Sequence, residues 1–125
     1  MDTVSFITAG LGDDLVVSFA VQRPEDPSDI ESLTLLRTPK YESFLDPDER
    51  GVSVSFDRLR DGDDERDLLQ EVRYSECDAT VELKTTARHY RLDVRKVDPE
   101  ELADMHRVFR KMNFDGKLRL IGMPK

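Results

Sequence analysis

The chain has 125 residues, of which 38% are hydrophobic and 37% are charged, and its formal net charge is −8. This length and composition predict one domain, residues 1–125, with a thin core and a densely charged surface. Residues 1–67 carry most of the acidity, with seventeen acidic and seven basic side chains. Because phosphate binding requires clustered lysine and arginine, we expect a basic protein as partner and no nucleic acid.

Two further classes of protein are disfavoured. Cys77 is the only cysteine, which excludes an intrachain disulfide. The amino terminus lacks the basic region of a signal peptide, and no stretch approaches the roughly 18 apolar residues of a membrane span. We therefore expect a cytoplasmic protein that does not enter a membrane.

The first predicted elements are two strands, Val4 to Thr8 and Leu15 to Val21, joined by a glycine-rich turn at 10–14. Leu15 to Val21 is apolar on both faces, so we expect it to be the central strand of a sheet. Residues 24–29 contain two prolines among acidic side chains, which predicts a surface loop.

The middle of the chain mixes short strands with polar segments. Residues 33–37 and 52–56 are predicted strands, the second because apolar and serine side chains alternate. The segment 41–49 stays ambiguous between a helical turn and an irregular turn. Residues 57–67 are the most charged run of the chain and are predicted to be a loop. Leu68 to Tyr74 fits a strand or a helical turn, and we assign it to a strand.

Residues 98–114 predict an amphipathic helix. Asp98 is expected to cap its amino terminus, with Glu101 closing a capping box. Asn113 is expected in the left-handed conformation at the other end, with Phe114 folded back on Phe109. One stripe of the helix is apolar, and we expect it to dock on a sheet; His106 lies at the edge of that stripe. The stripe consists of Leu102, Met105, Val108, Phe109 and Met112.

Residues 79–83 and 90–94 alternate apolar and charged side chains and predict an antiparallel hairpin, and 117–121 offers one more strand. Together the elements predict an α+β fold. It consists of a single, mostly antiparallel sheet of about six to eight strands. One long C-terminal helix, at about 99–113, packs on one face, and a short last strand follows it.

Motifs for catalysis or for cofactor and metal binding are incomplete. The acidic run from Asp57 resembles a calcium loop, but leucine occupies positions 59 and 68, where carboxylates are required. Gly10 and Gly12 are followed by a strand, so no helix terminus can hold a pyrophosphate. Two carboxylates flank Cys77 and disfavour its thiolate. We predict no catalytic residue, cofactor or metal.

The order of features resembles that of the small α+β immunity proteins encoded beside bacterial polymorphic toxins. Leu15 to Arg23 forms an apolar strand, a Pro/Asp loop and several strands follow, and the helix opens with Asp98-Pro99-Glu100-Glu101-Leu102 and ends in Val108-Phe109. The resemblance covers residues 15–114. It implies a protein that binds a cognate toxin domain and blocks it without chemistry of its own.

Three functional hypotheses follow. In the first, carboxylates in loops bind a basic protein such as a nuclease; the expected contact residues are Asp46, Asp48, Glu49, Asp61, Asp63, Asp64, Glu65 and Asp67. In the second, a small-molecule or enzymatic pocket lies between sheet and helix, with Tyr74, Tyr90 and His106 as its polar groups. In the third, the chain is a homo-oligomeric accessory protein that pairs through an exposed edge strand.

Overall fold

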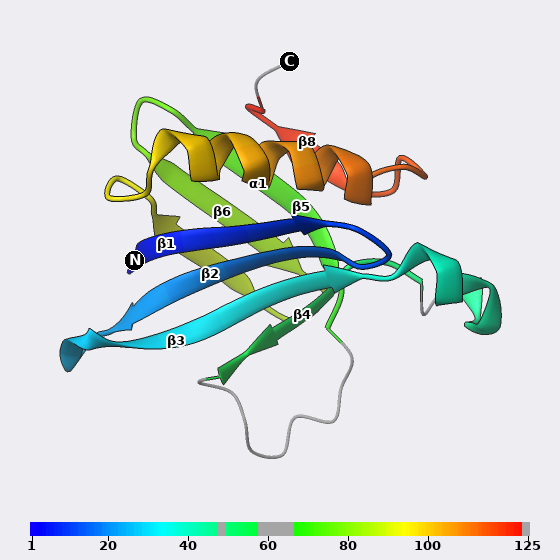
Figure 1. The fold of residues 1–125 in the computed structure, drawn as a ribbon, viewed down its shortest axis with the longest axis horizontal. Coiled ribbons are helices and arrows are strands. Elements are labelled where there is room, and N and C mark those ends of the chain that lie inside the picture. Colours follow the sequence, from blue (N-terminus) through cyan, green and yellow to red (C-terminus); the bar gives the residue numbers. More distant parts are fainter. Residues whose placement is uncertain (48–49, 58–66, 124–125) are drawn as a thin grey trace.

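The computed structural model describes residues 1–47, 50–57 and 67–123. The chain forms strands β1 to β3, a short 3-10 helix η1, strands β4 to β7, helix α1 and strand β8 (Figure 1). Their bounds are β1 Asp2–Leu11, β2 Leu15–Arg23, β3 Asp26–Arg37, η1 Pro39–Phe44, β4 Ser53–Phe56, β5 Leu69–Ser75, β6 Thr80–Thr85, β7 His89–Asp93, α1 Pro99–Met112 and β8 Arg119–Ile121.

All the described strands belong to one eight-stranded sheet in the order β4-β3-β2-β1-β7-β6-β5-β8. The predicted α+β class with one α-helix and one large sheet is confirmed. The sheet is mixed, however, because β1 pairs in parallel with β7, and β8 pairs in parallel with β5. The helix has 14 residues, which is not long, and β8 follows it. No helix among the described residues is long and apolar enough to cross a membrane.

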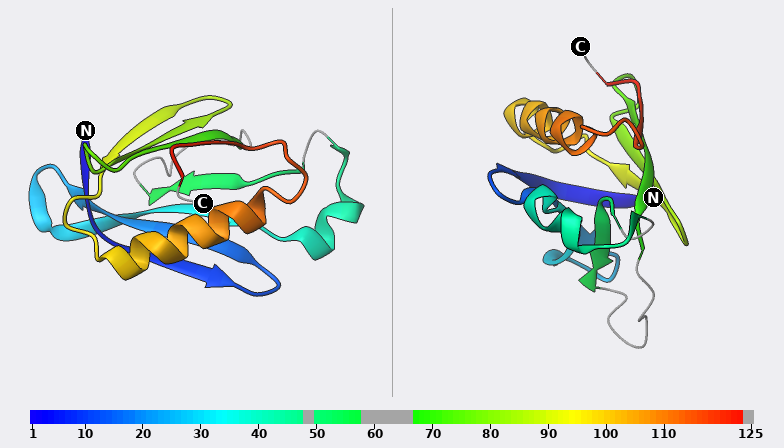
Figure 2. Two further views of the ribbon diagram at one scale, coloured as in Figure 1. Left: turned by 90° about the horizontal axis from the view of Figure 1, so that it is seen from above. Right: turned by 90° about the vertical axis from the view of Figure 1, so that its right-hand side faces the viewer.

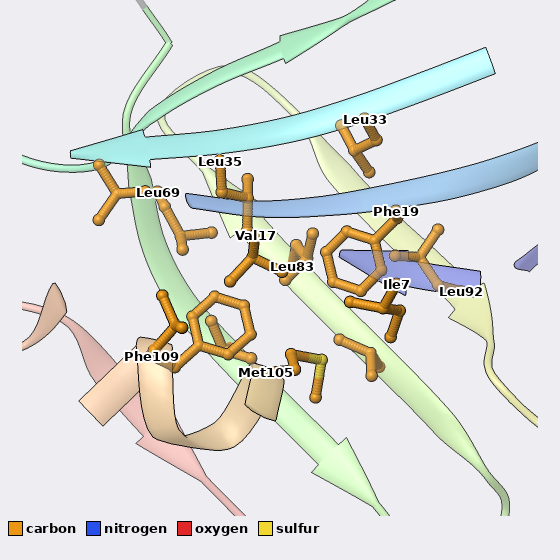
Figure 3. Packing of buried hydrophobic residues seen from close by; sticks show 14 of the residues in the cluster. Ile7, Val17, Phe19, Leu33, Leu35, Leu69, Leu83, Leu92, Met105 and Phe109 are labelled. Atoms are coloured by element: carbon orange, nitrogen blue, oxygen red, sulfur yellow. The ribbon is translucent and has the colours of Figure 1, made fainter. Parts of the chain in front are cut away.

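The sheet curls until its two halves enclose the core (Figure 2). The Leu69 amide donates to the Val52 carbonyl over 2.8 Å, and Ser53 bridges Leu68, so the beginning of β5 meets β4. Apolar side chains of β1 to β3 thus face those of β5 to β7, and α1 closes the remaining side with Met105 and Phe109 (Figure 3). This enclosed geometry buries 22 of the described apolar residues in one cluster.

The helix confirms the predicted stripe and the predicted cap at Asp98, but not the capping box or the left-handed end. Met105, Val108, Phe109 and Met112 are buried. The Asp98 side chain accepts from the Glu100 amide. The capping box is wrong, because Glu101 Oε1 instead accepts from the Ile7 amide over 2.8 Å. Beyond Thr3, β1 has no strand partner on this side, so Glu101 supplies the acceptor that a strand would provide.

The carboxyl end of α1 also differs from the prediction. Asn113 has a φ of −93° and is not left-handed, and Phe114 is exposed instead of packing on Phe109. Phe114 lies under the guanidinium of Arg37, whose Cζ is 4.1 Å from the ring centroid. A cation over its face therefore gives Phe114 a contact outside the core.

Two other predictions are resolved by the pairing of strands. The loop predicted at 24–29 is wrong, because β3 begins at Asp26 and only Pro24 and Glu25 form the turn. Pro27 is tolerated because β3 gains its second neighbour, β4, only from Leu33 onward. The strand assigned to Leu68 to Tyr74 is confirmed as β5.

Candidate functional site

Most of the predicted acidic contact residues lie outside the described residues: Asp48, Glu49, Asp61, Asp63, Asp64 and Glu65. Asp46 is exposed just after η1. The Asp67 carboxylate accepts hydrogen bonds from the hydroxyls of Thr85 and Thr86, each 2.7 Å long, and from the Ala87 amide. Asp67 therefore stabilises the turn between β6 and β7, and the partner contact expected of it stays a prediction.

An aromatic projection, which the sequence analysis did not single out, lies beside Asp46. Helix η1 extends beyond the end of β3 and away from the rest of the sheet (Figures 1 and 2). Tyr41 is 56% exposed and Phe44 is 83% exposed. We call η1 with these two side chains the aromatic knob. Two aromatic residues in an otherwise polar segment without strand alternation are the sequence signal that marks it.

A buried cluster of charges fixes the knob to the body of the protein. Arg37, only 3% exposed, donates to both carboxylate oxygens of Glu42, over 2.6 and 2.9 Å. Its guanidinium also donates to the carbonyl of Met112, at the end of α1, and to Asp115 over 2.8 Å. We call Arg37, Glu42 and Asp115 the arginine clamp. It joins β3, η1 and the carboxyl end of α1, where a cation is favoured by the helix dipole.

The electrostatics of the clamp agree with its geometry. Burial alone would lower the pKa of Arg37, but the hydrogen bonds to Glu42 and Asp115 outweigh it and keep that pKa above its ordinary value. The hydrogen bond from Arg37 lowers the pKa of Asp115. Arg37 and Asp115 are therefore charged at neutral pH, and the bidentate hydrogen bonds of Arg37 to Glu42 hold a fixed geometry.

Carboxylates of the β1–β2 turn lie against the knob. Lys40, on η1, makes an ion pair of 3.0 Å with Asp13, and the hydroxyl of Thr38 donates to Asp14 over 2.7 Å. Lys40 also lies 5.0 Å above the centroid of the Tyr41 ring. Arg50 also lies beside the knob, because its Nε donates to the Leu45 carbonyl over 3.2 Å. Asp13, Asp14 and Asp46 still outnumber Lys40 and Arg50, so the described surroundings of the exposed aromatic rings carry a small excess of negative charge.

The pocket predicted between sheet and helix is partly assembled. The rings of Tyr74 and His106 meet edge to face with centroids 4.6 Å apart. Beside them lies a hollow of about 370 Å³, also lined by Glu76, Arg107 and Arg110. Tyr90 is not among the residues that line it, because its ring packs edge to face against Phe56, at a centroid distance of 5.8 Å.

His106 is buried and not at the wet boundary expected for it. Burial, aided by the charge of Arg110, lowers its pKa, and its Nδ1 lies 2.8 Å from the sulfur of Met123. Burial, aided by Glu76, raises the pKa of Tyr74. Both groups are therefore neutral near pH 7, and the charged side chains that line the hollow are those of Glu76, Arg107 and Arg110.

No group of three or more histidine, cysteine, aspartate or glutamate side chains that could hold a metal occurs in the part of the chain that the structure describes. Cys77 is exposed and unbonded to another cysteine. The chain matches no protein-family model, no curated protein and no solved structure at a significant level. The functional assignment therefore depends on the geometry of the chain alone.

Proposed function

We propose that this chain is a non-enzymatic binding protein that docks on a basic protein through the aromatic knob and the carboxylates around it. Blocking such a partner, as the resemblance to immunity proteins implies, is the role that this surface suits. The observation that carries the proposal is the exposure of Phe44, 83% of whose surface meets solvent on a segment anchored by the arginine clamp.

The knob has the composition of an interface centre. Aromatic residues that fill a partner's pocket commonly supply most of the binding energy of a protein complex. Complete burial of the Phe44 ring would contribute about 2–3 kcal/mol by apolar area alone. Tyr41 adds a second ring with a hydroxyl for a polar contact, an arrangement that is enriched at interfaces.

The arginine clamp lowers the entropic cost of binding. A short segment of about one helical turn does not hold its shape by itself. Here Glu42 is fixed in the middle of η1 by two hydrogen bonds to a buried arginine, so Tyr41 and Phe44 are presented by an ordered backbone. Preorganisation of this kind increases affinity because less conformational freedom is lost on association.

The surrounding carboxylates favour a basic partner. Asp13, Asp14 and Asp46 are exposed beside the knob, and the predicted contact residues Asp48 and Glu49 follow directly in the sequence. Complementary charges at the rim of an interface mainly accelerate association and select the partner. Since exposed charges are screened within about 8 Å at physiological salt, binding should weaken as salt rises.

The proposal is tested by affinity capture with three baits: the wild-type chain, the double variant Tyr41→Ser/Phe44→Ser, and the control Ile30→Ser. Ile30 is 41% exposed near the other end of β3, so its replacement removes a comparable exposed apolar side chain away from η1. We expect a basic protein that the wild type and the control retain at 50 mM salt, and that the double variant loses.

Raising the salt to 500 mM should release this protein from the wild type. Equal capture by the knob variant, or retained proteins that are acidic and insensitive to salt, would refute the proposal. Melting curves of all three baits ensure that lost binding is not lost folding.

The contact between Tyr74 and His106 supports a second candidate, a site for a small polar ligand in the hollow beside α1. A ligand that binds only the folded state raises the melting temperature. A panel of metabolites screened against the wild type and His106→Gln would reveal it as a shift confined to the wild type. The absence of any such shift would leave the knob as the remaining site.

A further inference from the structure

The outer face of the first four strands carries no charged side chain among its described residues. The alternation of buried and exposed positions along β1 to β4 defines this face. Its side chains are Ser5, Phe6, Thr8, Gly10, Val16, Ser18, Ala20, Gln22, Ile30, Ser32, Thr34, Leu36, Ser53 and Ser55. We call it the charge-free face. Charges begin at its borders: Asp57 accepts a hydrogen bond from the Ser32 amide, and beyond Ile30 the exposed start of β3 carries Asp26 and the ion pair of Arg23 with Asp29.

The rest of the sheet shows how unusual this face is for the chain. On β6, the side chains of Glu82 and Lys84 form ion pairs with Arg91 and Glu71 on the neighbouring strands. With 37% charged residues in the sequence, an outer face of four strands without any charge is not explained by composition. It also exposes three large apolar side chains, Phe6, Ile30 and Leu36. Smaller or polar side chains separate the three, so they offer hydrophobic contacts at three points of an otherwise uncharged face.

We propose that the charge-free face binds a second copy of this chain. A protein of net charge −8 repels its own copies wherever two charged surfaces meet. The charge-free face allows two copies to approach without opposing like charges, whereas it offers a basic partner nothing to pair with. The inference is independent of the proposed function, because η1 and the arginine clamp do not belong to this face.

The positions of the side chains on the charge-free face are compatible with twofold symmetry. The strand register places Phe6 beside Ala20, Ser18 beside Thr34, and Val16 beside Leu36. Phe6 and Leu36 therefore lie at opposite corners, with Ser18 midway between them. Consider a twofold axis that lies in the plane between the two faces, passes through Ser18 and runs perpendicular to the line from Phe6 to Leu36. This axis brings Phe6 of each copy against Leu36 of the other. Such an interface is isologous, the commonest kind among homodimers.

The area of the face sets the strength of the association. Strands lie about 4.8 Å apart and rise about 3.3 Å per residue, so four strands of about seven residues cover roughly 400 Å² per copy. Two copies would bury roughly 800 Å² in total, below the roughly 1,200 Å² of stable interfaces. The dimer should therefore be weak and should dissociate on dilution, with a dissociation constant in the micromolar range.

Sedimentation of the full chain at 5 and 500 µM tests the inference. We expect the wild type to shift from monomer to dimer across this range. Ser18→Glu and Ser18→Lys should each stay monomeric at 500 µM, because identical charges then meet near the axis. An equimolar mixture of the two variants should restore the dimer. The matched controls Gln70→Glu and Gln70→Lys place the same charges at an exposed position on β5 and should dimerise like the wild type.

A gentler variant serves if a charge at position 18 impairs folding. Ser18→Cys in a Cys77→Ser background changes the side chain little, and a short bifunctional maleimide should join the two copies, because stacked sheets lie about 10 Å apart. Gln70→Cys in the same background should not cross-link. A wild type that stays monomeric at 500 µM would overturn the inference. So would a dimer that survives Ser18→Glu and leaves Ser18→Cys uncross-linked, since that dimer would use another surface, such as an edge strand.

Discussion

Removing the guanidinium of Arg37 should destabilise the fold more than any change to a surface charge. Arg37→Met leaves Glu42, 9% exposed, without its counter-ion and deprives the Met112 carbonyl of a donor. Breaking a buried pair by removing one partner costs about 3–5 kcal/mol, because the remaining charge stays desolvated. We expect the free energy of unfolding, measured by urea denaturation followed by circular dichroism, to fall by about this amount.

Two comparisons decide whether this reasoning is correct. The double variant Arg37→Met/Glu42→Leu should recover part of the loss, because an apolar pair of similar volume replaces both charges. The control Arg107→Met removes an exposed ion pair with Asp104, 2.9 Å long, and should cost less than about 1 kcal/mol. If Arg37→Met costs no more than Arg107→Met, the clamp does not anchor η1 in the way described.

Three further changes test other contacts by the same urea assay. Between pH 7.5 and 5.5 the free energy of unfolding of the wild type should decrease as pH falls, because burial lowers the pKa of His106 and only the unfolded chain takes up its proton. His106→Gln should make the free energy of unfolding less dependent on pH. An unchanged dependence would exclude His106 as its cause. Gly122 has a φ of +77°, and a Cβ added there would meet the backbone oxygen of Tyr74 on β5. Gly122→Ala should therefore lower the free energy of unfolding by about 2 kcal/mol or more, and Gly12→Ala by only about 0.5 kcal/mol. Glu101→Ala should cost about 1–3 kcal/mol by leaving the Ile7 amide without an acceptor, and Glu101→Gln clearly less; equal losses would contradict the role of the hydrogen bond.

Much of the fold could be predicted because the chain carries strong local patterns. The apolar stripe of α1 and the alternation along β6 and β7 specify elements whose neighbours in space are neighbours in sequence. The contacts that curl the sheet involve partners distant in sequence, such as Ser53 with Leu68 and Asp2 with Leu92. No local pattern encodes these pairings, so the sheet was expected to be mostly antiparallel and proved to be mixed.

The same limit applies to the candidate site. Arg37 ends a predicted strand, and Asp115 lies between the predicted helix and the predicted last strand, 78 residues away. Only the folded chain brings them together with Glu42, so the sequence alone did not reveal the arginine clamp. The spacing of Glu101 from Asp98 fits a capping box, but the Glu101 carboxylate instead accepts a hydrogen bond from the Ile7 amide of β1, which has no strand partner there. A tertiary hydrogen bond overrides the local motif there.

The central claim, that the aromatic knob binds a basic protein, is tested most directly by photo-cross-linking from position 44. A benzoylphenylalanine in place of Phe44 keeps an aromatic ring at the most exposed side chain of the knob; the control places the same group at Ile30. Irradiation in cells that produce the protein should yield one main adduct from position 44, with a basic protein, and not from position 30. Adducts with acidic proteins, or the same adducts from both positions, would contradict the account.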